Sequence, residues 1–446
     1  MTDFENVTTH RGVSGSRGWV VAPIHALDDP APQDRYVLVA DDLTPADTAG
    51  LDLALVAGFC TAGGGPTSHT VQVAHNLGIP AVVAAGPMVL TVVSGTMCAL
   101  DGDAGLLHAG LHGGDLRSAK DREGEHAQRD RLRRARALAV GPVAGGVTLS
   151  TTFVKPAQVA EFAHSAASGI GLLATELLFL GREGEITDED AHFRAYTELA
   201  RAVGEAEITV RTLDIGGDKP VPALKLPQED NSFLGVRGLR LALGRPQDLL
   251  IPQLRALYRA AACGARLRIM FPMVTTVEEF TRAATIAENI RNQLRAPDVP
   301  LGVMVEVPAC ALTVDLFAEH VDFLSIGTND LTQYLLATSR TNPALAHDID
   351  PLHVSVNRTV AQVTAAAAVA AVPVTACGGL AASPVGAVVL ASLGISGLTV
   401  TMAAIPAVHE ALSRLDDDAR RTIRHQALTT GGTDHLTEHV TARLAL

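Results

Sequence analysis

One histidine of the sequence lies in a setting that suits phosphoryl chemistry. The run GGGPTSHT, residues 63–70, places His69 between a glycine-rich turn and an apolar-periodic stretch. Such a turn lets the main chain approach a ligand closely, and Thr67 and Ser68 are natural N-caps for a helix that begins at His69. The free N–H groups and the dipole at a helix N-terminus favour an anion. His69 could therefore carry a phosphoryl group transiently, or it could be an incidental histidine in a capped turn.

A second set of polar residues falls at or just past the ends of apolar runs in the C-terminal two thirds of the chain. Glu306 and Asp330 offer hard oxygen ligands, which suit Mg2+ bound by two carboxylates together with substrate oxygens. Three arginines could converge as bidentate clamps for an anion. The arginines are Arg211, Arg237 and Arg340, and the other residues at these ends are Met273, Asn329 and Cys377. Taken singly, such a cysteine is usually a core residue and such an arginine a solvated one, but joint placement on one face favours a site.

The elements that must position these residues alternate regularly. Apolar, β-branched runs separated by helical stretches predict one (β/α)8 barrel, and continuously apolar strands are typical of a sheet buried on both faces. The carboxyl ends of barrel strands form the active-site face, which would bring these polar residues together. The runs are residues 147–153, 169–175, 207–214, 267–274, 301–307, 322–329, 372–377 and 397–402. Helices are predicted at 275–294, at 356–371 and in the closing stretch 415–446.

The rest of the chain indicates a smaller α/β domain and a charged helix. Short apolar runs among glycines and valines before residue 112 are typical of short strands with tight turns. Residues 116–139 are charged almost throughout, which predicts a solvated helix that is either a link between domains or a plain surface helix. The predicted division is 1–112 for the first domain, 113–142 for the helix, and 143–446 for the barrel with its closing helices.

Composition excludes several classes of protein. The 446 residues include 35 Lys and Arg against 48 Asp and Glu, a net charge of −13 that argues against a nucleic-acid partner. The cysteines are odd in number, widely spaced and without a CxxC pair, so a disulfide framework or cysteine zinc site is not expected. They are Cys60, Cys98, Cys263, Cys310 and Cys377. No membrane span and no leader pattern are expected, and a reducing cytoplasm fits best.

Several blocks of the sequence resemble known proteins. The segment TAGGGPTSHTVQVAHNLGIPAVV is similar to the phosphohistidine motif of phosphoenolpyruvate-utilising enzymes. The blocks RTLDIGGDK, NSFLGVRGLR, LRIMFPMVTTVEEF, GVMVEVPA and DFLSIGTNDLTQYLLATSRTN resemble phosphoenolpyruvate–protein phosphotransferase, enzyme I of the bacterial sugar phosphotransferase system. The resemblance runs collinearly from Arg11 to Leu412.

This resemblance implies a swivelling phosphohistidine domain, joined by a linker helix to a barrel that binds phosphoenolpyruvate and Mg2+. It implies that His69 is phosphorylated and that Cys377 protonates the enolate carbon. It also implies that Asn329 lies beside the substrate and that barrels pair as a homodimer. By the same resemblance, the metal ligands are Glu306 and Asp330, and the substrate-binding arginines are Arg211, Arg237 and Arg340.

The chain departs from the family pattern at four places. Residues 24–35 stand where the family has a helical insertion that docks the carrier protein HPr, and they are too few for a helical subdomain. Ala174 replaces an arginine and so removes one charged clamp. The third departure follows Cys377, where the family's Gly-Glu is Gly378-Gly379 and its later Gly-Asp is Ala382-Ser383. The fourth is Pro66 and His75, which stand in place of two arginines.

Three hypotheses follow. Because the nucleophile, the acid and both metal ligands are retained, the first is a Mg2+-dependent phosphotransferase-like enzyme that works through phospho-His69. Its substrate would be phosphoenolpyruvate or a related phosphorylated small molecule, and its acceptor a small molecule or a carrier protein other than ordinary HPr. The second hypothesis is a barrel enzyme that catalyses elimination or phosphoryl removal on another phosphorylated molecule. The third is a regulatory homologue without turnover.

Overall fold

The structure of the protein is a computed structural model. It divides into two compact units, which are described separately. Unit 1 comprises Met1–Ala135 and Leu336–Asp350, and unit 2 comprises Arg136–Leu335 and Pro351–Leu446. The predicted boundaries at residues 112 and 142 stay predictions. The described residues are all except 1–3, 5, 6, 31, 45, 46, 49, 66, 67, 154–158, 180, 181, 218–220, 222, 223, 228, 346, 347 and 446.

Unit 1 is built on a mixed sheet of eight strands in the order β1-β8-β7-β3-β4-β5-β6-β2. Strands β3, β4, β5 and β6 run parallel, and the other pairings are antiparallel. The strands are β1 (Thr8–Arg11), β2 (Val13–Ser16), β3 (Trp19–Ala26), β4 (Tyr36–Ala40), β5 (Val56–Thr61), β6 (Ala81–Val83), β7 (Met97–Asp101) and β8 (Leu106–Ala109). The helix α2 (His69–Leu77) packs on this sheet through Val71 and Ala74, and its N-terminus is the predicted one.

The connection between β3 and β4 is short. Ala26 ends β3 and Tyr36 begins β4, and these two strands pair directly in parallel. Among the described residues of this connection, residues 27–30 and 32–35 form turns and bends and no helix. The described residues of this connection therefore form a turn at the surface.

The charged segment forms the long helix α3 (Gly113–Val140). Most of its side chains are exposed, and Ala119 and Ala137 are its fully buried apolar residues. In unit 1 the main-chain carbonyl of Ala119 accepts a 3.0 Å hydrogen bond from the indole of Trp19. The predicted solvated helix at 116–139 is confirmed, while its role as a link stays a prediction.

Unit 2 contains a closed barrel of eight parallel strands, β10 to β17, each paired with the next, with β17 pairing β10. All eight predicted runs are strands, and the predicted α/β fold with a (β/α)8 barrel is confirmed. A two-residue strand, β9, pairs antiparallel with the first two residues of β10, Val147 and Thr148. The strands are β9 (Val143–Ala144), β10 (Val147–Phe153), β11 (Gly169–Ala174), β12 (Glu207–Arg211), β13 (Leu267–Phe271), β14 (Leu301–Val305), β15 (Phe323–Gly327), β16 (Val374–Cys377) and β17 (Gly397–Val400).

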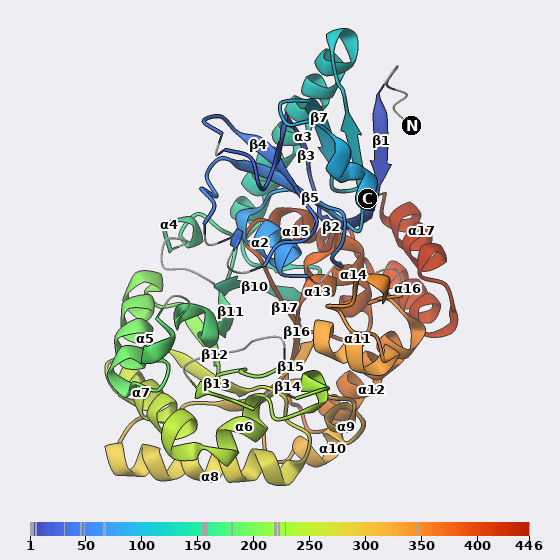
Figure 1. Cartoon of the computed structure of the whole chain (residues 1–446). Helices are drawn as coiled ribbons and strands as arrows, with labels where there is room; N and C mark the ends of the chain where they lie inside the picture. The colour runs from blue at the N-terminus through green and yellow to red at the C-terminus, as the bar shows by residue number, and fades with distance from the viewer. Residues whose placement is uncertain are drawn as a thin grey trace. The chain divides into compact units, whose positions relative to one another are not determined.

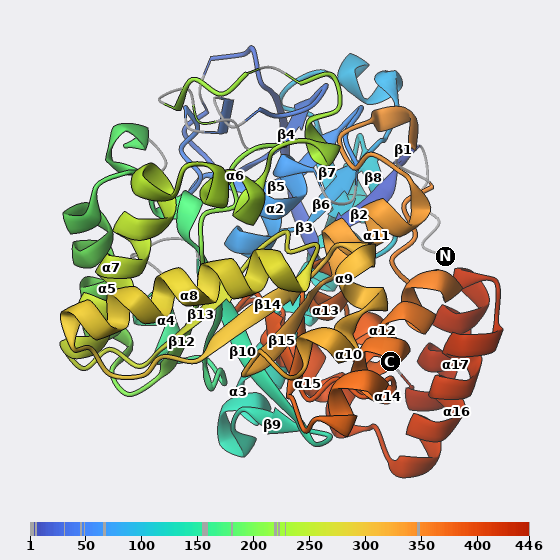
Figure 2. The same ribbon diagram turned by 90° about the horizontal axis from the view of Figure 1, so that it is seen from below.

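Helices surround the barrel strands, with α5, α7 and α8 outside β12 and β13 and the closing helices α16 and α17 side by side (Figures 1 and 2). The helices are α4 (Val159–Phe162), α5 (Glu189–Val203), α6 (Gly238–Gly244), α7 (Ile251–Ala262), α8 (Val277–Leu294), α9 (Pro308–Leu312), α10 (Val314–Phe317), α11 (Thr328–Leu336), α12 (Val354–Val369), α13 (Gly379–Ala382), α14 (Pro384–Ser392), α15 (Ile405–Ser413), α16 (Asp417–Thr429) and α17 (Thr433–Leu444). Among the described residues, no helix is long and apolar enough to span a membrane.

The sequence explains why these elements form. Strand residues are buried on both faces, as the continuous apolar runs predict. Some helix starts carry side-chain caps, for example the capping box in which Thr276 and Glu279 satisfy each other's main-chain N–H groups ahead of α8. One large apolar cluster fills the space between strands and helices, and a small one lies inside the barrel. The inner cluster consists of Met270, Met304, Phe323 and Cys377.

Candidate active site

The predicted site residues of the barrel lie at the carboxyl ends of its strands. Arg211 is the last residue of β12, Glu306 follows β14, and Cys377 is the last residue of β16. Asn329 and Asp330 lie in the first turn of α11, directly after β15. The predicted placement on one face is therefore confirmed for these residues.

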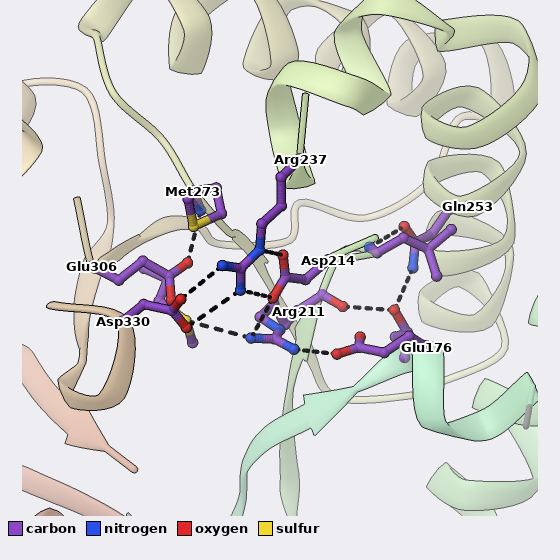
Figure 3. Close-up of polar contacts among 11 residues, drawn as sticks. Glu176, Arg211, Asp214, Arg237, Gln253, Met273, Glu306 and Asp330 are labelled. Atoms are coloured by element: carbon purple, nitrogen blue, oxygen red, sulfur yellow. Dashed lines mark hydrogen bonds and ion pairs between the residues drawn. The ribbon is translucent and has the colours of Figure 1, made fainter. Parts of the chain in front are cut away.

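Arg237 is the centre of a buried ionic cluster (Figure 3). Its Nε and Nη2 atoms donate to the two oxygens of Asp214, each at 3.0 Å. Its Nη1 and Nη2 atoms donate to Asp330, at 2.7 and 3.3 Å. Burial disfavours the charged guanidinium, but the carboxylates of Asp214 and Asp330 outweigh it and raise the pKa of Arg237 above its usual value. Arg237 therefore stays charged inside the protein and ties the end of β12 to the start of α11.

Arg211 joins the same cluster from the end of β12. It donates to the carboxylate of Glu176, lies 3.3 Å from Asp214 and contacts the sulfur of Met304 at 3.8 Å. Ala174 is the residue of β11 that pairs with Arg211, so a longer side chain at position 174 would stand next to this guanidinium.

Glu306 is a buried acid held by a main-chain N–H group. Met273 lies in the left-handed region at a φ of 56°, and its N–H donates to Glu306 at 2.8 Å. Burial, followed by the negative charges of Asp330 and Asp214, raises the pKa of Glu306 to about 7. Burial is the larger cause, and the two neighbouring carboxylates add to it.

This donor set fits a divalent cation. Four carboxylates face two guanidinium groups, so the fully ionised cluster carries two uncompensated negative charges. Among the described residues, no group of three or more His, Cys, Asp or Glu is arranged as a complete ligand set. Glu306 and Asp330 are the carboxylates of this set that would hold Mg2+, an ion that proteins usually bind through one or two carboxylates together with substrate oxygens and water.

The side-chain amide of Asn329 is held through its oxygen. Its Oδ1 accepts a 3.0 Å hydrogen bond from the N–H of Gly379, so its amide Nδ2 is the group left for an acceptor. Gly378 has a φ of 100°, and a Cβ there would lie 2.4 Å from the hydroxyl oxygen of Thr328 and 2.8 Å from Oδ1 of Asn329. A glycine is thus required where the chain leaves β16.

Cys377 lies in the barrel interior. Its thiol contacts the carbonyl oxygen of Ile326 at 3.6 Å, and it packs with Met270, Met304 and Phe323. Burial, reinforced by the negative charge of Glu306, raises the pKa of the Cys377 thiol to about 12. The thiol is therefore protonated at neutral pH, as an acid that gives a proton to a carbon must be.

The surroundings of Ser383 and Gly379 show what these two positions of the departures can accommodate. Ser383 is the N-cap of α14 and accepts from the N–H of Gly386, a role that Ser and Asp share. A Cβ at Gly379 would lie 3.6 Å from Oδ1 of Asn329, an ordinary contact, so the backbone there tolerates a side chain. The change at 383 is therefore structurally neutral, and the glycine at 379 is not imposed by space.

A cleft of about 220 Å³ opens beside Arg237. Arg237, Met273 and Tyr334 line it together with the turn at Phe233–Gly235. The hydroxyl of Tyr334 donates to the carbonyl of Phe233 at 2.5 Å and accepts from Arg237 at 3.5 Å. Arg237 is thus the member of the ionic cluster that forms part of the cleft wall.

In unit 1, His69 is the first residue of α2. Ser68 is the N-cap, with its hydroxyl accepting from the N–H of Val71 at 3.5 Å, and Thr70 donates to Asp42 at 3.3 Å. The predicted position of His69 at a capped helix N-terminus is confirmed, whereas Pro66 and Thr67 lie outside the described residues. Burial lowers the pKa of His75 in the last turn, so this residue does not supply the positive charge of the arginine it replaces.

The structure brings some of the predicted residues together within unit 2. Arg211, Arg237, Glu306 and Asp330 form the ionic cluster of unit 2, and Asn329 and Cys377 lie at neighbouring strand ends. His69 belongs to unit 1, and Arg340 lies in the segment Leu336–Asp350, which groups with unit 1. The convergence of Arg340 on the other two arginines stays a prediction.

Sequence reasoning missed Asp214 and Glu176, which balance the charges of the two arginines. Asp214 follows Arg211 by three residues in RTLDIGGDK, so an acidic residue close after a strand end was the available signal. Glu176 lies two residues past β11, at the same face. Its pairing with Arg211 depends on the register of β11 against β12, which the sequence does not display.

Comparison with known families covers both parts of the chain. Residues 144–417 match the PEP-binding domain of PEP-utilising enzymes, and residues 32–105 match the mobile domain of PEP-utilising enzymes. The first match alone spans more than half of the chain.

Curated relatives agree with these matches. The chain is 46% identical over 399 residues to a multiphosphoryl transfer protein of Xanthomonas campestris pv. campestris, covering 89% of this chain and 47% of that protein. It is 43% identical to a protein of the same name from Rhodobacter capsulatus, covering 88% and 48%. It is 36% identical over 432 residues to a phosphoenolpyruvate-protein phosphotransferase of Staphylococcus aureus, covering 94% and 75%.

The chain thus spans about half the length of the first two relatives and three quarters of the third. The barrel, the ionic cluster at its carboxyl end and the two family matches agree. The chain belongs to the family of phosphoenolpyruvate-utilising enzymes.

Proposed function

We propose that this chain transfers the phosphoryl group of phosphoenolpyruvate to His69, with Mg2+ held by Glu306 and Asp330. The observation that carries the proposal is the buried cluster of four carboxylates and two guanidinium groups at the carboxyl end of the barrel. Its excess negative charge suits a divalent cation, and Arg211 and Arg237 offer donors for phosphate and carboxylate oxygens.

The chain's own residues supply each remaining part of the reaction. A nitrogen of His69 forms a bond to phosphorus while the bond from phosphorus to the enolate oxygen breaks. The thiol of Cys377 gives its proton to the enolate carbon, which yields pyruvate, and the thiolate then takes a proton from water. A bound Mg2+ would neutralise the charge that develops on the enolate. Asn329 and the arginines, with Arg340 among them, would hold the substrate in place.

The acceptor of the phosphoryl group is proposed to be a carrier protein other than ordinary HPr, or a small molecule. The short turn between β3 and β4 supports this, because the family's docking insertion would occupy that place. The relatives named above as phosphoenolpyruvate-protein phosphotransferase and multiphosphoryl transfer proteins support phosphoryl transfer to a protein. A cytoplasmic homodimer, in which α3 lets His69 reach the barrel, completes the proposal.

The identity of the substrate is tested by a substitution at Ala174, the residue of β11 that pairs with Arg211. One charge-assisted hydrogen bond contributes about 1.5–3 kcal/mol, so Ala174→Arg should strengthen phosphoenolpyruvate binding about 10- to 100-fold if that compound is the substrate. Calorimetric titration with phosphoenolpyruvate and Mg2+ measures this directly. Weaker binding in the variant would indicate a different ligand that uses the space.

The proposal is tested with phosphoenolpyruvate labelled on phosphorus. The parent protein should take up acid-labile label with Mg2+ and lose this ability with EDTA. His69→Ala should take up none, while a control at the exposed His112, His112→Ala, should match the parent. Pyruvate release without label, retained in His69→Ala, would favour elimination or phosphoryl removal. Binding without label or turnover would favour a regulatory homologue.

A further inference from the structure

A chain of buried hydrogen bonds lies behind the ionic cluster, on the side of α5 and α7. Gln253 of α7 is its centre: Nε2 donates to the hydroxyl of Thr175 at 3.0 Å and to that of Tyr196 at 2.9 Å, and Oε1 accepts from the N–H of Leu213 at 3.0 Å. The hydroxyl of Thr175 in turn donates to the carbonyl of Arg211 at 2.9 Å. Figure 3 shows the dashed lines that lead from Gln253 to the main-chain carbonyl of Arg211.

The donors and acceptors of the hydrogen bonds between His192, Tyr196 and Gln253 follow from the protonation of His192. Nε2 of His192 lies 2.9 Å from the carbonyl of Ile186, which can only accept, so this nitrogen carries the proton. Burial lowers the pKa of His192 to about 4, so the ring is neutral and Nδ1 accepts from Tyr196 at 2.9 Å. The Tyr196 oxygen therefore accepts from Gln253, whose second N–H is left for Thr175.

These bonds hold the carboxyl end of β12 at two adjacent points. The carbonyl of Arg211 and the N–H of Leu213 flank one residue, and both are bound by groups that α7 and the turn after β11 provide. Arg211 and Asp214 leave the main chain on either side of this fixed segment. The amide of Gln253 is fully used, and Gln253 is 1% exposed.

We propose that Gln253 and Thr175 are positioning residues that set the place of Arg211 and Asp214 in the active site. This inference rests on the proposed function. A substrate clamp displaced by about 1 Å can cost about 100-fold in rate, so main-chain bonds at the base of the clamp affect catalysis more than their own strength suggests. Replacing Thr175 by Val removes the hydroxyl at nearly constant volume and frees the end of β12.

The test compares Thr175→Val with a matched control elsewhere in the barrel. The hydroxyl of Thr364 is also buried and donates to a main-chain carbonyl, that of Leu393, at 2.7 Å. Both Thr→Val variants should lose similar thermal stability. Thr175→Val should lower kcat/KM for phosphoenolpyruvate-dependent labelling of His69 by 10-fold or more, Thr175→Ser should recover to within about 3-fold of the parent, and Thr364→Val should stay within about 2-fold.

Gln253→Leu should show the same kinetic loss as Thr175→Val, and the Thr175 variants keep the test valid if the Leu variant does not fold. Equal kcat/KM for Thr175→Val and Thr364→Val would overturn the positioning role while leaving the proposed function intact. Absence of labelling in the parent would overturn the proposed function, and this inference with it.

Discussion

The two ends of the barrel are built from the same eight strands but carry different side chains. At the carboxyl end, Arg237 is 1% exposed and is bound by two buried carboxylates. At the amino end, a cavity of about 240 Å³ is lined mainly by small hydroxyl residues and glycines. Its one charged pair, Arg268 and Glu207, lies 3.4 Å apart with side chains 20% and 45% exposed.

This contrast shows where the fold tolerates charge. Buried charges at the carboxyl end depend on each other, because removing one leaves its partner uncompensated in a medium of low dielectric. The pair at the amino end is partly exposed, and Arg268 also stacks on the ring of Phe323, with its guanidinium carbon 3.7 Å from the ring centroid. Substitutions at the two ends should therefore differ sharply in both activity and stability.

The largest difference is expected between two glutamates at opposite ends. Glu306→Gln removes a proposed metal ligand and should lower phosphoenolpyruvate-dependent labelling of His69 by about 1000-fold, equivalent to about 4 kcal/mol of transition-state stabilisation. Glu207→Gln at the amino end should leave the rate within about 2-fold of the parent. Similar rates for the two variants would contradict the assignment of chemistry to the carboxyl end.

The next difference concerns two arginines. Arg237→Met leaves Asp214 and Asp330 without their shared partner, and the free energy of unfolding should fall by about 3–5 kcal/mol. Arg268→Met breaks a partly exposed ion pair and should lower the free energy of unfolding by about 0–1 kcal/mol. Urea denaturation of both variants measures the difference. A loss for Arg268→Met as large as that for Arg237→Met would show that the two ends do not differ in this way.

The smallest expected effect is on the pH dependence of stability. It concerns His192, which belongs to the buried hydrogen bonds behind the carboxyl end of the barrel. His192 has a pKa of about 4 in the folded protein, against an ordinary value of 6.5 in the unfolded chain. Between these values the unfolded chain binds more protons, so stability is fully present above pH 6.5 and falls as the pH decreases toward 4, by at most about 1.4 kcal/mol per pH unit.

His192→Gln should remove this part of the pH dependence, as measured by urea denaturation at pH 4.5 to 7. His425 is exposed on α16, so His425→Gln should keep the slope of the parent. An unchanged slope in His192→Gln would mean that His192 is not held neutral in the folded protein.

Much of the fold was predictable because parallel strands buried on both faces appear in the sequence as continuous apolar runs. The placement of Arg211, Glu306 and Cys377 followed from the same rule, since each lies where such a run ends. The start of α2 at His69 was predictable from local capping chemistry, with Ser68 as the observed cap.

The partners of these residues were not predictable. Gln253 reaches Thr175 across 78 positions of sequence, and its contact depends on how α7 packs against β12. The pairing of Arg211 with Glu176 depends on strand register. Such contacts are set by tertiary packing, which neither hydrophobic periodicity nor residue spacing encodes.

The central claim is that one phosphoryl group passes from phosphoenolpyruvate to His69. The most direct measurement follows pyruvate and intact protein mass in the same sample after mixing with phosphoenolpyruvate and Mg2+. One equivalent of pyruvate should form together with a mass gain of one phosphoryl group, in the parent and in His112→Gln but not in His69→Gln. Pyruvate without the mass gain, or a mass gain that persists in His69→Gln, would contradict the claim.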